Sequence, residues 1–436
     1  MLSSWCTLLA LLLTATATPA APPPPTTLVG RGAYPRGIST TGELIVCSSM
    51  SVYAAPVFPG GEPGNFTFRG TVFRDARAGV ELGNCHLLHL GGGSILSSYR
   101  HHTGCTEGTP HCAQYTLQAA LSSDAGRTWT PQGTIVSSTV GMWEPFLVAW
   151  PPVPTVELYD GPLLHTPHNS SSADAATAAA TATDTATATV PMLVRVLYSQ
   201  ELTNGGHQSI VWRESPDLGI TWRAPLNSPE VISNGDEFGT RDGMPGLARL
   251  VDGSLFVVFE SVKQGGGGGG RGAGGGARQG GAAGVGGGAW QGVRRGVWEG
   301  QRAGDAPPPH FFHVLARRSF DGGATWTSKR SVYNASTAGR NAGAPQVVAH
   351  GGRLTVSFMT DEDSGKAHWV DDASSKMLTA RNDGGGGAPL QFAAEDRVVA
   401  RAGPGALWPG LFATQDGAEA FVTFGQAGST FIQGPI

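Results

Sequence analysis

Two glutamates have surroundings that suit acid–base chemistry. Glu144 lies in the run Trp-Glu-Pro-Phe at 143–146, where the large apolar neighbours disfavour full exposure of its carboxyl group. Glu260 ends the apolar run 255–259, so its side chain is either solvated at the rim of a sheet or aimed into a central pit. Two carboxyl groups on separate structural units, one protonated and one ionised, are what glycoside hydrolysis requires. Glu144 and Glu260 are therefore the candidate catalytic pair.

Other charged side chains are candidates for a supporting role near such a pair. The further carboxylates are Asp75, Asp242, Asp361, Glu362 and Asp363, and the positive charges are Arg36, Arg100 and Arg241. These residues come from segments that are far apart in the sequence. Only a fold that gathers widely separated segments around one point can bring them together.

The elements that carry these residues are predicted to be short β-strands. The segments 42–46, 93–100, 252–260 and 352–358 each begin with a glycine-containing turn and continue as a β-branched or aromatic run of strand length. Outside the N-terminal residues and an Ala/Thr-rich stretch, no segment shows a long helical period. Repeated turn-then-strand units predict an all-β repeat architecture.

A second repeat is more specific. The pattern S-x-D-x-G-x-T-W occurs at 122–129, 215–222 and 319–326. Its Asp can bond backbone N–H groups across a hairpin turn, its Gly permits a positive φ, and its Trp covers the apolar side of the hairpin. The pattern resembles the Asp boxes of sialidase-like β-propellers, which implies a structural role. The residues concerned are Asp124, Trp129, Asp217, Trp222, Asp321 and Trp326.

Two low-complexity segments interrupt the pattern. Residues 165–190 are almost wholly Ala, Thr, Ser and Asp, and residues 264–309 are Gly-rich with scattered Arg. Neither can bury enough apolar surface to offset its ordering entropy, so both are predicted to be disordered insertions in surface loops. The roughly 340 remaining residues, at ~40–50 per blade, predict a six-bladed β-propeller of the sialidase type, with seven blades as the alternative. Because the chain ends soon after 423–424, closure of the ring is in question.

The chain also resembles a narrower family, the exo-arabinanases of glycoside hydrolase family 93, which are six-bladed propellers that release arabinobiose from α-1,5-linked arabinan. The matching stretches, in the family's order, are 34–36, 143–147, 241–244, 259–261, 343–346, 357–363 and 408–412. The resemblance implies that Glu144 and Glu260 are the catalytic glutamates of a retaining enzyme, with carboxyl groups ~5–5.5 Å apart. We favour Glu144 as the acid/base and Glu260 as the nucleophile.

The same resemblance implies a set of substrate-binding residues around the central pit. Their polar groups would bind sugar hydroxyls, and the tryptophans would stack on sugar faces. The set is Arg36, Arg100, His102, Trp143, Arg241, Asp242, Gln346 and Trp408. The expected partner is a polysaccharide or oligosaccharide. No cofactor or metal is implied, because the reaction needs only the two carboxyl groups and water.

Two other functions stay open. An exo-α-sialidase shares the Asp-box pattern, and Arg36 sits where sialidases carry an arginine for the sialic acid carboxylate. Such an enzyme needs three convergent arginines and a Tyr/Glu nucleophile pair, for which the candidates are Tyr99, Tyr198 and Tyr333. A non-catalytic, sugar-binding propeller is the second alternative, since a shared fold does not determine function.

Composition and the N-terminal residues indicate export. Residues 1–21 have the apolar run and small residues of a signal peptide and lead into a Pro-rich start, and 22–436 would form one catalytic domain. N-glycosylation motifs occur at 65–67, 169–171 and 334–336. A net charge of −4 argues against nucleic-acid binding, and no other segment approaches a membrane span. We expect a secreted monomer.

Four cysteines remain after the signal segment, an even number that suits disulfides. Cys105 and Cys112 flank a short loop and are the first predicted pair, which leaves Cys47 and Cys85 as the second. A zinc site is the alternative because histidines lie nearby at 101, 102 and 111. The spacing matches no standard zinc pattern.

Overall fold

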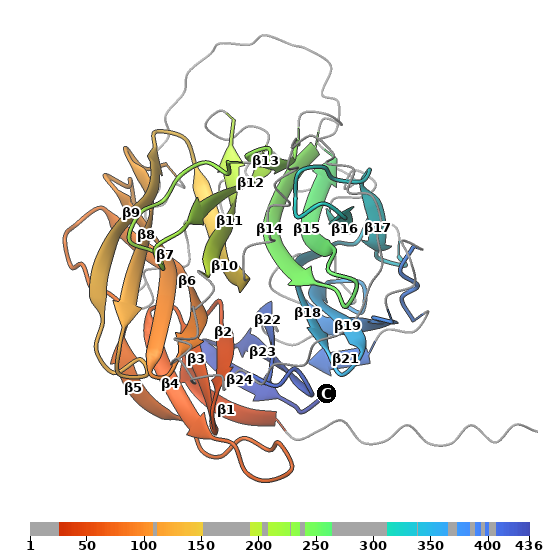
Figure 1. Ribbon diagram of the computed structural model, residues 1–436, viewed down its shortest axis with the longest axis horizontal. Coiled ribbons are helices and arrows are strands. Elements are labelled where there is room, and N and C mark those ends of the chain that lie inside the picture. The colour runs from red at the N-terminus through yellow and green to blue at the C-terminus, as the bar shows by residue number, and fades with distance from the viewer. Residues whose placement is uncertain are drawn as a thin grey trace, which may run out of the picture.

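The computed structural model is a ring of six four-stranded sheets around a central axis, a six-bladed β-propeller (Figure 1). The structure describes residues 26–107, 111–150, 192–202, 208–226, 228–235, 240–263, 312–337, 339–364, 373–383, 389–393, 397–400 and 407–436. Every regular element in these ranges is a strand, which confirms the predicted all-β, six-bladed fold. Within the same ranges, no helix is long and apolar enough to cross a membrane.

In each blade the chain runs through antiparallel strands from the axis outward, and the first strands of neighbouring blades contact one another. The strands of the first three blades are β2 (Arg36–Thr40), β3 (Glu43–Ser48), β4 (Ser51–Pro56) and β5 (Thr67–Thr71); β6 (Val80–Gly91), β7 (Ser94–Thr103), β8 (Tyr115–Ser122) and β9 (Thr130–Ser138); and β10 (Met142–Trp150), β11 (Leu193–Glu201), β12 (Gln208–Ser215) and β13 (Val231–Ser233).

The other three blades follow the same plan. Their strands are β14 (Thr240–Arg249), β15 (Leu255–Lys263), β16 (Phe312–Ser319) and β17 (Arg330–Tyr333); β18 (Ala342–His350), β19 (Arg353–Thr360), β20 (Ser374–Arg381) and β21 (Arg397–Ala400); and β22 (Leu407–Ala413), β23 (Ala420–Gln426), β24 (Ser429–Gln433) and β1 (Thr26–Arg31).

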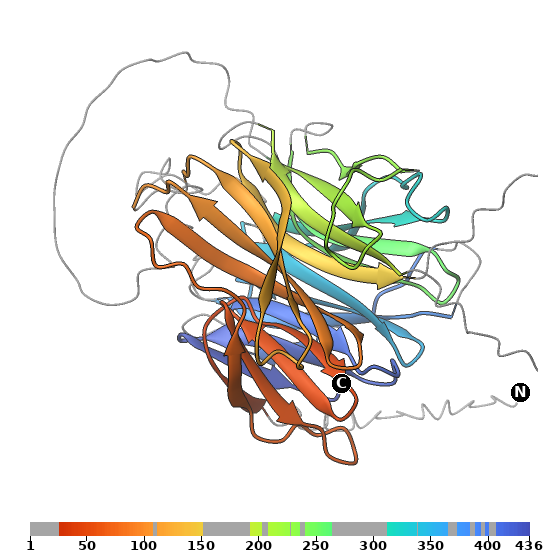
Figure 2. The same cartoon turned by 60° about the vertical axis from the view of Figure 1, so that its left-hand side comes forward.

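The ring closes through its N-terminal strand. β1 pairs antiparallel with β24, from Thr26 opposite Gln433 to Arg31 opposite Ser429, and so supplies the outer strand of blade 6. Figures 1 and 2 accordingly show the red strands of blade 1 beside the blue strands of blade 6. The short C-terminus, which left closure in question at the sequence level, is sufficient because the missing strand comes from the other end of the chain.

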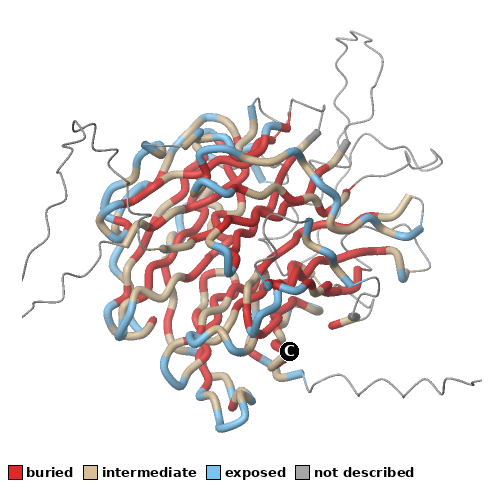
Figure 3. The backbone as a smooth tube through the Cα atoms, turned by 45° about the vertical axis from the view of Figure 1, so that its right-hand side comes forward, coloured by how far each residue is buried: buried red, intermediate tan, exposed pale blue. Residues whose placement is uncertain are grey.

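Apolar side chains fill each junction between blades. Between blades 1 and 2, for example, Ile45 and Val52 pack with Leu87 and Ile95. The five other junctions have clusters of the same kind, and a seventh cluster lies at the axis. Alternation along each strand places these residues inward, and Figure 3 shows buried backbone running through every blade with exposed residues at the turns.

The three S-x-D-x-G-x-T-W segments form the turns between the third and fourth strands of blades 2, 3 and 4. In each turn the serine hydroxyl donates to the aspartate Oδ1 at 2.8 Å, and the threonine hydroxyl donates to Oδ2 at 2.6 Å. The glycine packs closely against the preceding blade: a Cβ on Gly323 would lie 2.2 Å from the Trp212 ring. Asp124, Asp217 and Asp321 therefore hold hairpins together.

Both predicted disulfides are present, Cys47–Cys85 between blades 1 and 2 and Cys105–Cys112 within blade 2. The predicted signal peptide (1–21), the two predicted insertions (165–190 and 264–309) and the glycosylation motif at 169–171 lie outside the described residues. The other two motifs are described, and their asparagines, Asn65 and Asn334, are exposed.

Candidate active site

A β-bulge interrupts the first strand of five blades, where two residues oppose one on the second strand. In β6, for instance, Asn84 and Cys85 together oppose Tyr99 of β7. The first residue of every bulge has a positive φ that is unusual for a side chain other than glycine. These residues are Asn84 (52°), Glu144 (50°), Met244 (53°), Ala344 (51°) and Trp408 (56°), and Tyr34 (52°) has the same conformation just before β2 of blade 1.

The neighbours of the bulge residues repeat as well. The following residue is proline in five blades, which suits a bulge because proline donates no ladder hydrogen bond and fixes its own φ. These prolines are Pro35, Pro145, Pro245, Pro345 and Pro409. The opposed residue on the second strand is a buried aromatic in every bulged blade: Tyr99, Tyr198, Phe259, Phe358 and Phe424.

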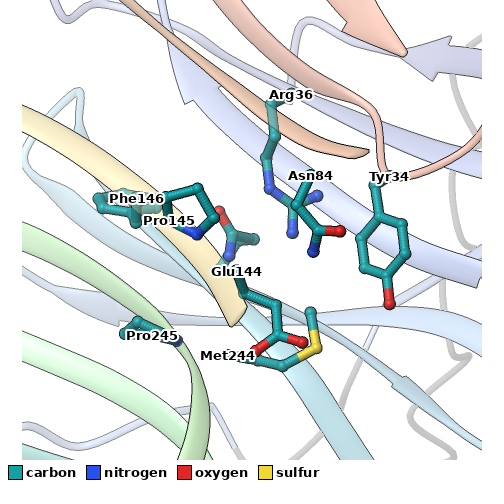
Figure 4. Close-up of a pocket in the computed structure, with 9 residues that line it drawn as sticks. Tyr34, Arg36, Asn84, Glu144, Pro145, Phe146, Met244 and Pro245 are labelled. Carbon is teal, nitrogen blue, oxygen red and sulfur yellow. The ribbon is translucent and has the colours of Figure 1, made fainter. Parts of the chain in front are cut away.

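A cavity lies where these bulges meet the axis (Figure 4). Four of the six residues with a positive φ line it, Tyr34, Asn84, Glu144 and Met244, together with residues one or two positions after such a residue. The full lining is Tyr34, Arg36, Asn84, Glu144, Pro145, Phe146, Met244, Pro245 and Gln346. Among the six equivalent bulge positions, only that of blade 3 carries a carboxylate, Glu144.

The Glu144 carboxyl is held by the neighbouring strand β11. Ser199 donates its hydroxyl to Glu144 Oε2 at 3.0 Å and itself accepts the Met244 N–H at 3.0 Å. The serine hydroxyl thus uses its single proton on the carboxylate and one of its two lone pairs on the backbone N–H. Burial raises the pKa of Glu144, and the positive charge of Arg241 and the Ser199 hydrogen bond limit the rise.

Glu260 reaches the same region from the second strand of blade 4. It pairs in register with Gly243, and the missing side chain there leaves room for its carboxyl: a Cβ on Gly243 would lie 3.4 Å from Glu260 Oε1. Its Oε2 accepts the Ala344 N–H at 2.9 Å, and its Oε1 lies 3.5 Å from Arg241 Nη1. Burial raises the pKa of Glu260 to about 7, against the opposing charge of Arg241 and with a further rise from Glu144.

The structure thus brings together the two glutamates singled out in the sequence. They belong to adjacent blades, Glu260 is buried and Glu144 is partly buried, and the pKa values of both are influenced by Arg241. The Glu144 charge contributes to the raised pKa of Glu260, so the two carboxyl groups are electrostatically coupled. One coupled pair of carboxyl groups with raised pKa values can hold one proton between them near neutral pH.

The arginines predicted to bind substrate have protein partners. Arg100 forms an ion pair with Glu81 and lies 5.1 Å from the Trp143 ring centroid. Its position in blade 2, opposite Gly83, is equivalent to that of Glu260 in blade 4. Arg36 donates to the carbonyls of residues 35, 408 and 409, and burial lowers the pKa of its guanidinium to about 10. Arg36 both lines the cavity and ties blade 1 to blade 6.

Other predicted binding residues lie behind the cavity lining. His102 is fully buried between the rings of Tyr115 and Trp143, and its Nε2 is 3.0 Å from the Met142 carbonyl. The Trp143 indole is itself only 9% exposed.

Asp242 also points away from the cavity, because it alternates with Gly243 along β14. It is fully buried and accepts hydrogen bonds from Ser233, Ser261 and Lys329 at 2.7, 2.8 and 2.6 Å. These bonds give Asp242 the contacts of a structural residue within blade 4.

Gln346 and Trp408 do lie at the axis. Gln346 lines the cavity, and Trp408 stacks on Tyr34 with ring centroids 4.4 Å apart. Tyr34, Asn84 and Met244 were not among the predicted site residues. The signal that identifies them is the X-Pro dipeptide repeated once per blade, with Asn-Cys in its place in blade 2.

The remaining candidate carboxylates bind other protein groups. Asp75 accepts hydrogen bonds from Arg77 and His101, and Asp361 accepts the Asn341 N–H at 2.6 Å. Glu362 and Asp363 lie 2.6 and 3.1 Å from the Lys376 ammonium. None of these four is among the described residues that line the cavity.

The tyrosines proposed for a sialidase mechanism also lie elsewhere. Tyr99 and Tyr198 are the buried aromatics opposite two bulges, and the Tyr333 hydroxyl bonds Glu362. The tyrosine at the cavity is Tyr34, and burial together with the Glu144 charge raises the pKa of its phenol well above the usual value.

One group of possible metal ligands occurs among the described residues. Side-chain atoms of Glu81, His102 and Cys112 lie within 4.8 Å of one another. The Cys112 sulfur is bonded to Cys105, so it is not a thiolate ligand, and only two donors remain. The donor set does not fit a zinc site.

No protein-family model matches the chain, and no curated protein matches it in sequence. Its fold is similar to solved structures. A GH93 α-L-arabinofuranosidase of Fusarium graminearum with arabinobiose has 15% identity and a TM-score of 0.50, over 94% of this chain and 95% of that one. An α-L-arabinanase of Penicillium chrysogenum complexed with arabinobiose has 13% identity and a TM-score of 0.50, over 94% and 97%.

A further structure of the Fusarium graminearum arabinofuranosidase, with an iminosugar inhibitor, has 14% identity and a TM-score of 0.51, over 93% of this chain and 96% of that one. At these identities the likeness establishes the propeller fold. The proteins that share it include the GH93 glycosidases to which the sequence motifs are similar.

Proposed function

We propose that this protein is a secreted glycoside hydrolase that acts from the chain end on α-1,5-linked arabinan with retention of configuration. The observation that carries the proposal is the coupled pair Glu144 and Glu260, both with raised pKa values: Glu144 lines the axial cavity, and Glu260 is buried in the adjacent blade. The fold is that of arabinan-active glycosidases solved with arabinobiose. Two disulfides are consistent with export.

The pKa directions favour a division of roles opposite to the one suggested by the sequence. Burial gives Glu260 a pKa of about 7, so it retains a proton near neutral pH and suits the general acid/base. Glu144 accepts a hydrogen bond from the Ser199 hydroxyl, which favours its ionised form and suits the nucleophile.

The reaction then follows in two steps. Glu260 protonates the glycosidic oxygen as the Glu144 carboxylate attacks the anomeric carbon, which breaks the bond to the leaving sugar and forms a glycosyl ester on Glu144. Glu260, now ionised, takes a proton from water as that water attacks the anomeric carbon and releases Glu144. Arg241, 3.5 Å from Glu260 Oε1, stabilises the ionised acid/base between the steps.

A sialidase needs arginines that are free to hold a carboxylate. Here Arg36 donates to backbone carbonyls, Arg100 pairs with Glu81, and Arg241 lies against Glu260. These contacts favour a neutral sugar over sialic acid.

Product release from linear α-1,5-arabinan and from a sialylated oligosaccharide, measured side by side, tests the proposal. Arabinobiose from the first supports it, and free sialic acid from the second would replace it with a sialidase. A folded protein that binds arabino-oligosaccharides but releases neither product would be a sugar-binding propeller. For variants of Glu144 and Glu260, Glu214→Gln is a matched control, because Glu214 is a buried glutamate of blade 3 that pairs with Arg195 and is not part of the cavity lining.

A further inference from the structure

Blade 2 differs from the other blades at the residue after the bulge. There Asn84 is followed by Cys85 in place of proline, and Cys85 is disulfide-bonded to Cys47 of blade 1. Asn84 nevertheless has the backbone conformation found in the proline-containing bulges, with a φ of 52° against 50° at Glu144. The disulfide therefore occurs where the other five blades have proline.

Proline and a disulfide restrain a chain by different means. Proline limits its own φ, whereas the disulfide ties Cys85 to a strand of the next blade. Cys47 pairs in register with Arg36, and Cys85 directly follows Asn84, and both Arg36 and Asn84 line the cavity. The bond thus joins β6, the strand that carries Asn84, to β3, the strand paired with the one that carries Arg36.

The Asn84 side chain has the properties of a ligand-binding group. It is only 6% exposed, and it lines the same cavity as Glu144 (Figure 4). Its Oδ1 atom has no hydrogen-bond partner among the described residues. A buried acceptor without a donor is costly, so a hydroxyl group entering the cavity gains by donating to it. Asn84 also occupies the bulge position in blade 2 that Glu144 occupies in the adjacent blade 3.

We infer that Asn84 accepts a hydrogen bond from a sugar hydroxyl beside Glu144, and that the Cys47–Cys85 disulfide positions Asn84 as proline positions the other bulge residues. The inference rests on the proposed function for the class of ligand, a neutral sugar. Asn84 contacts the substrate, and the disulfide acts through Asn84. The Cys105–Cys112 disulfide closes a loop within blade 2 and lies outside the cavity lining, so it serves as the internal control.

The first experiment addresses Asn84. Asn84→Ala is expected to raise KM for arabinan oligosaccharides about tenfold with a smaller change in kcat, the effect of losing one hydrogen bond to the bound sugar. Isothermal titration calorimetry with arabinobiose measures the same loss of affinity without turnover. Asn84→Asp, which keeps the acceptor oxygen, is expected to bind more tightly than Asn84→Ala. Wild-type KM and arabinobiose affinity in Asn84→Ala would overturn the binding role.

The second experiment separates positioning from stability. The double variant Cys47→Ser/Cys85→Ser, checked for folding by thermal melting, is expected to lose at least about tenfold in kcat/KM. Cys47→Ala/Cys85→Pro places proline where the other blades have it and is expected to recover most of that loss without a disulfide. Cys105→Ser/Cys112→Ser is expected to keep wild-type kcat/KM. Equal kcat/KM in the two Cys47/Cys85 variants would overturn the positioning role.

A failure of the proposed function is distinguishable from a failure of this inference. If the wild-type protein neither cleaves arabinan nor binds arabinobiose, the proposed function and the sugar contact fail together. The positioning role is then decided by crystal structures of the two Cys47/Cys85 variants. The positioning role is supported if Asn84 keeps its positive φ in the proline variant and loses it in the serine variant. The same φ in both variants overturns it.

Discussion

The two ends of the blades place the same chemical group in opposite environments. At the cavity end, Glu260 is buried and Glu144 is partly buried, and the pKa values of both are raised. At the opposite end, where the third strands finish, the turn aspartates each collect several donors. The Thr128 hydroxyl and N–H lower the pKa of Asp124 to about 2. Burial raises the pKa of Asp217, but hydrogen bonds from Thr221 and Ser215 outweigh it.

The comparison teaches how one scaffold separates stability from chemistry. The turns repeat side chain for side chain, because each must make the same hydrogen bonds to hold its hairpin. The bulges repeat only the backbone conformation and, except in blade 2, the following proline, and their side chains differ from blade to blade. A carboxylate with a full set of donors is fixed in its ionised form, whereas a desolvated one with few donors remains able to exchange a proton.

The largest expected effect tests the cavity end. Glu144→Gln and Glu260→Gln should each lower kcat on arabinan by at least about 10³-fold, because each removes a group that reacts with the substrate or transfers its proton. Both should melt as cooperatively as the wild-type protein in a calorimeter. Glu214→Gln should retain kcat. A near-normal rate in Glu144→Gln or Glu260→Gln would contradict the assignment of that residue as catalytic.

A smaller but still large effect tests the turn end. Gly323→Ala should lower the free energy of unfolding by about 4 kcal/mol, because its Cβ meets the Trp212 ring at 2.2 Å and its φ is 105°. Gly42→Ala, at a φ of 82° with open space around it, should cost only about 1 kcal/mol. Denaturant unfolding measures both, and equal losses would contradict the packing argument.

The raised pKa of Glu260 predicts a stability that depends on pH. Since its pKa rises from 4.5 in the unfolded chain to about 7 in the fold, the folded state holds the extra proton between these values. The wild-type protein should therefore lose stability as pH rises through this window, by up to about 3 kcal/mol. Glu260→Gln should lack this component, so its stability relative to wild type should increase from pH 4.5 to about pH 8, measured by unfolding across pH. A pH-independent difference would argue against a raised pKa.

The smallest expected effect concerns one turn hydrogen bond. Ser215→Ala should lower the free energy of unfolding by about 2 kcal/mol, because the buried Gly219 N–H loses its acceptor. Activity per folded molecule should be unchanged. Ser331→Ala, at an exposed strand position, provides the control, and it should unfold at the wild-type denaturant midpoint. A drop in kcat for Ser215→Ala would show that this turn affects the cavity at the other end of the blade.

Much of the fold was predictable because it depends on local sequence patterns. Turn-then-strand units and the turns ending in Trp129, Trp222 and Trp326 specify hairpins from neighbouring residues alone. Glu144 and Glu260 were also identifiable, because apolar neighbours in the same strand are enough to predict that a carboxyl group is not fully exposed. Both disulfides followed from an even cysteine count and one short loop.

The rest required the tertiary structure, because it depends on pairings between distant segments. Closure depends on β1 meeting β24 across the whole chain, and the direction of Asp242 away from the cavity depends on which face of β14 packs inward. The access of Glu260 depends on Gly243 in a different strand, and the roles of Tyr34 and Asn84 depend on a bulge that no single segment reveals. The sequence by itself determined the blades and their two acids, and only the assembled ring decided which side chains surround those acids.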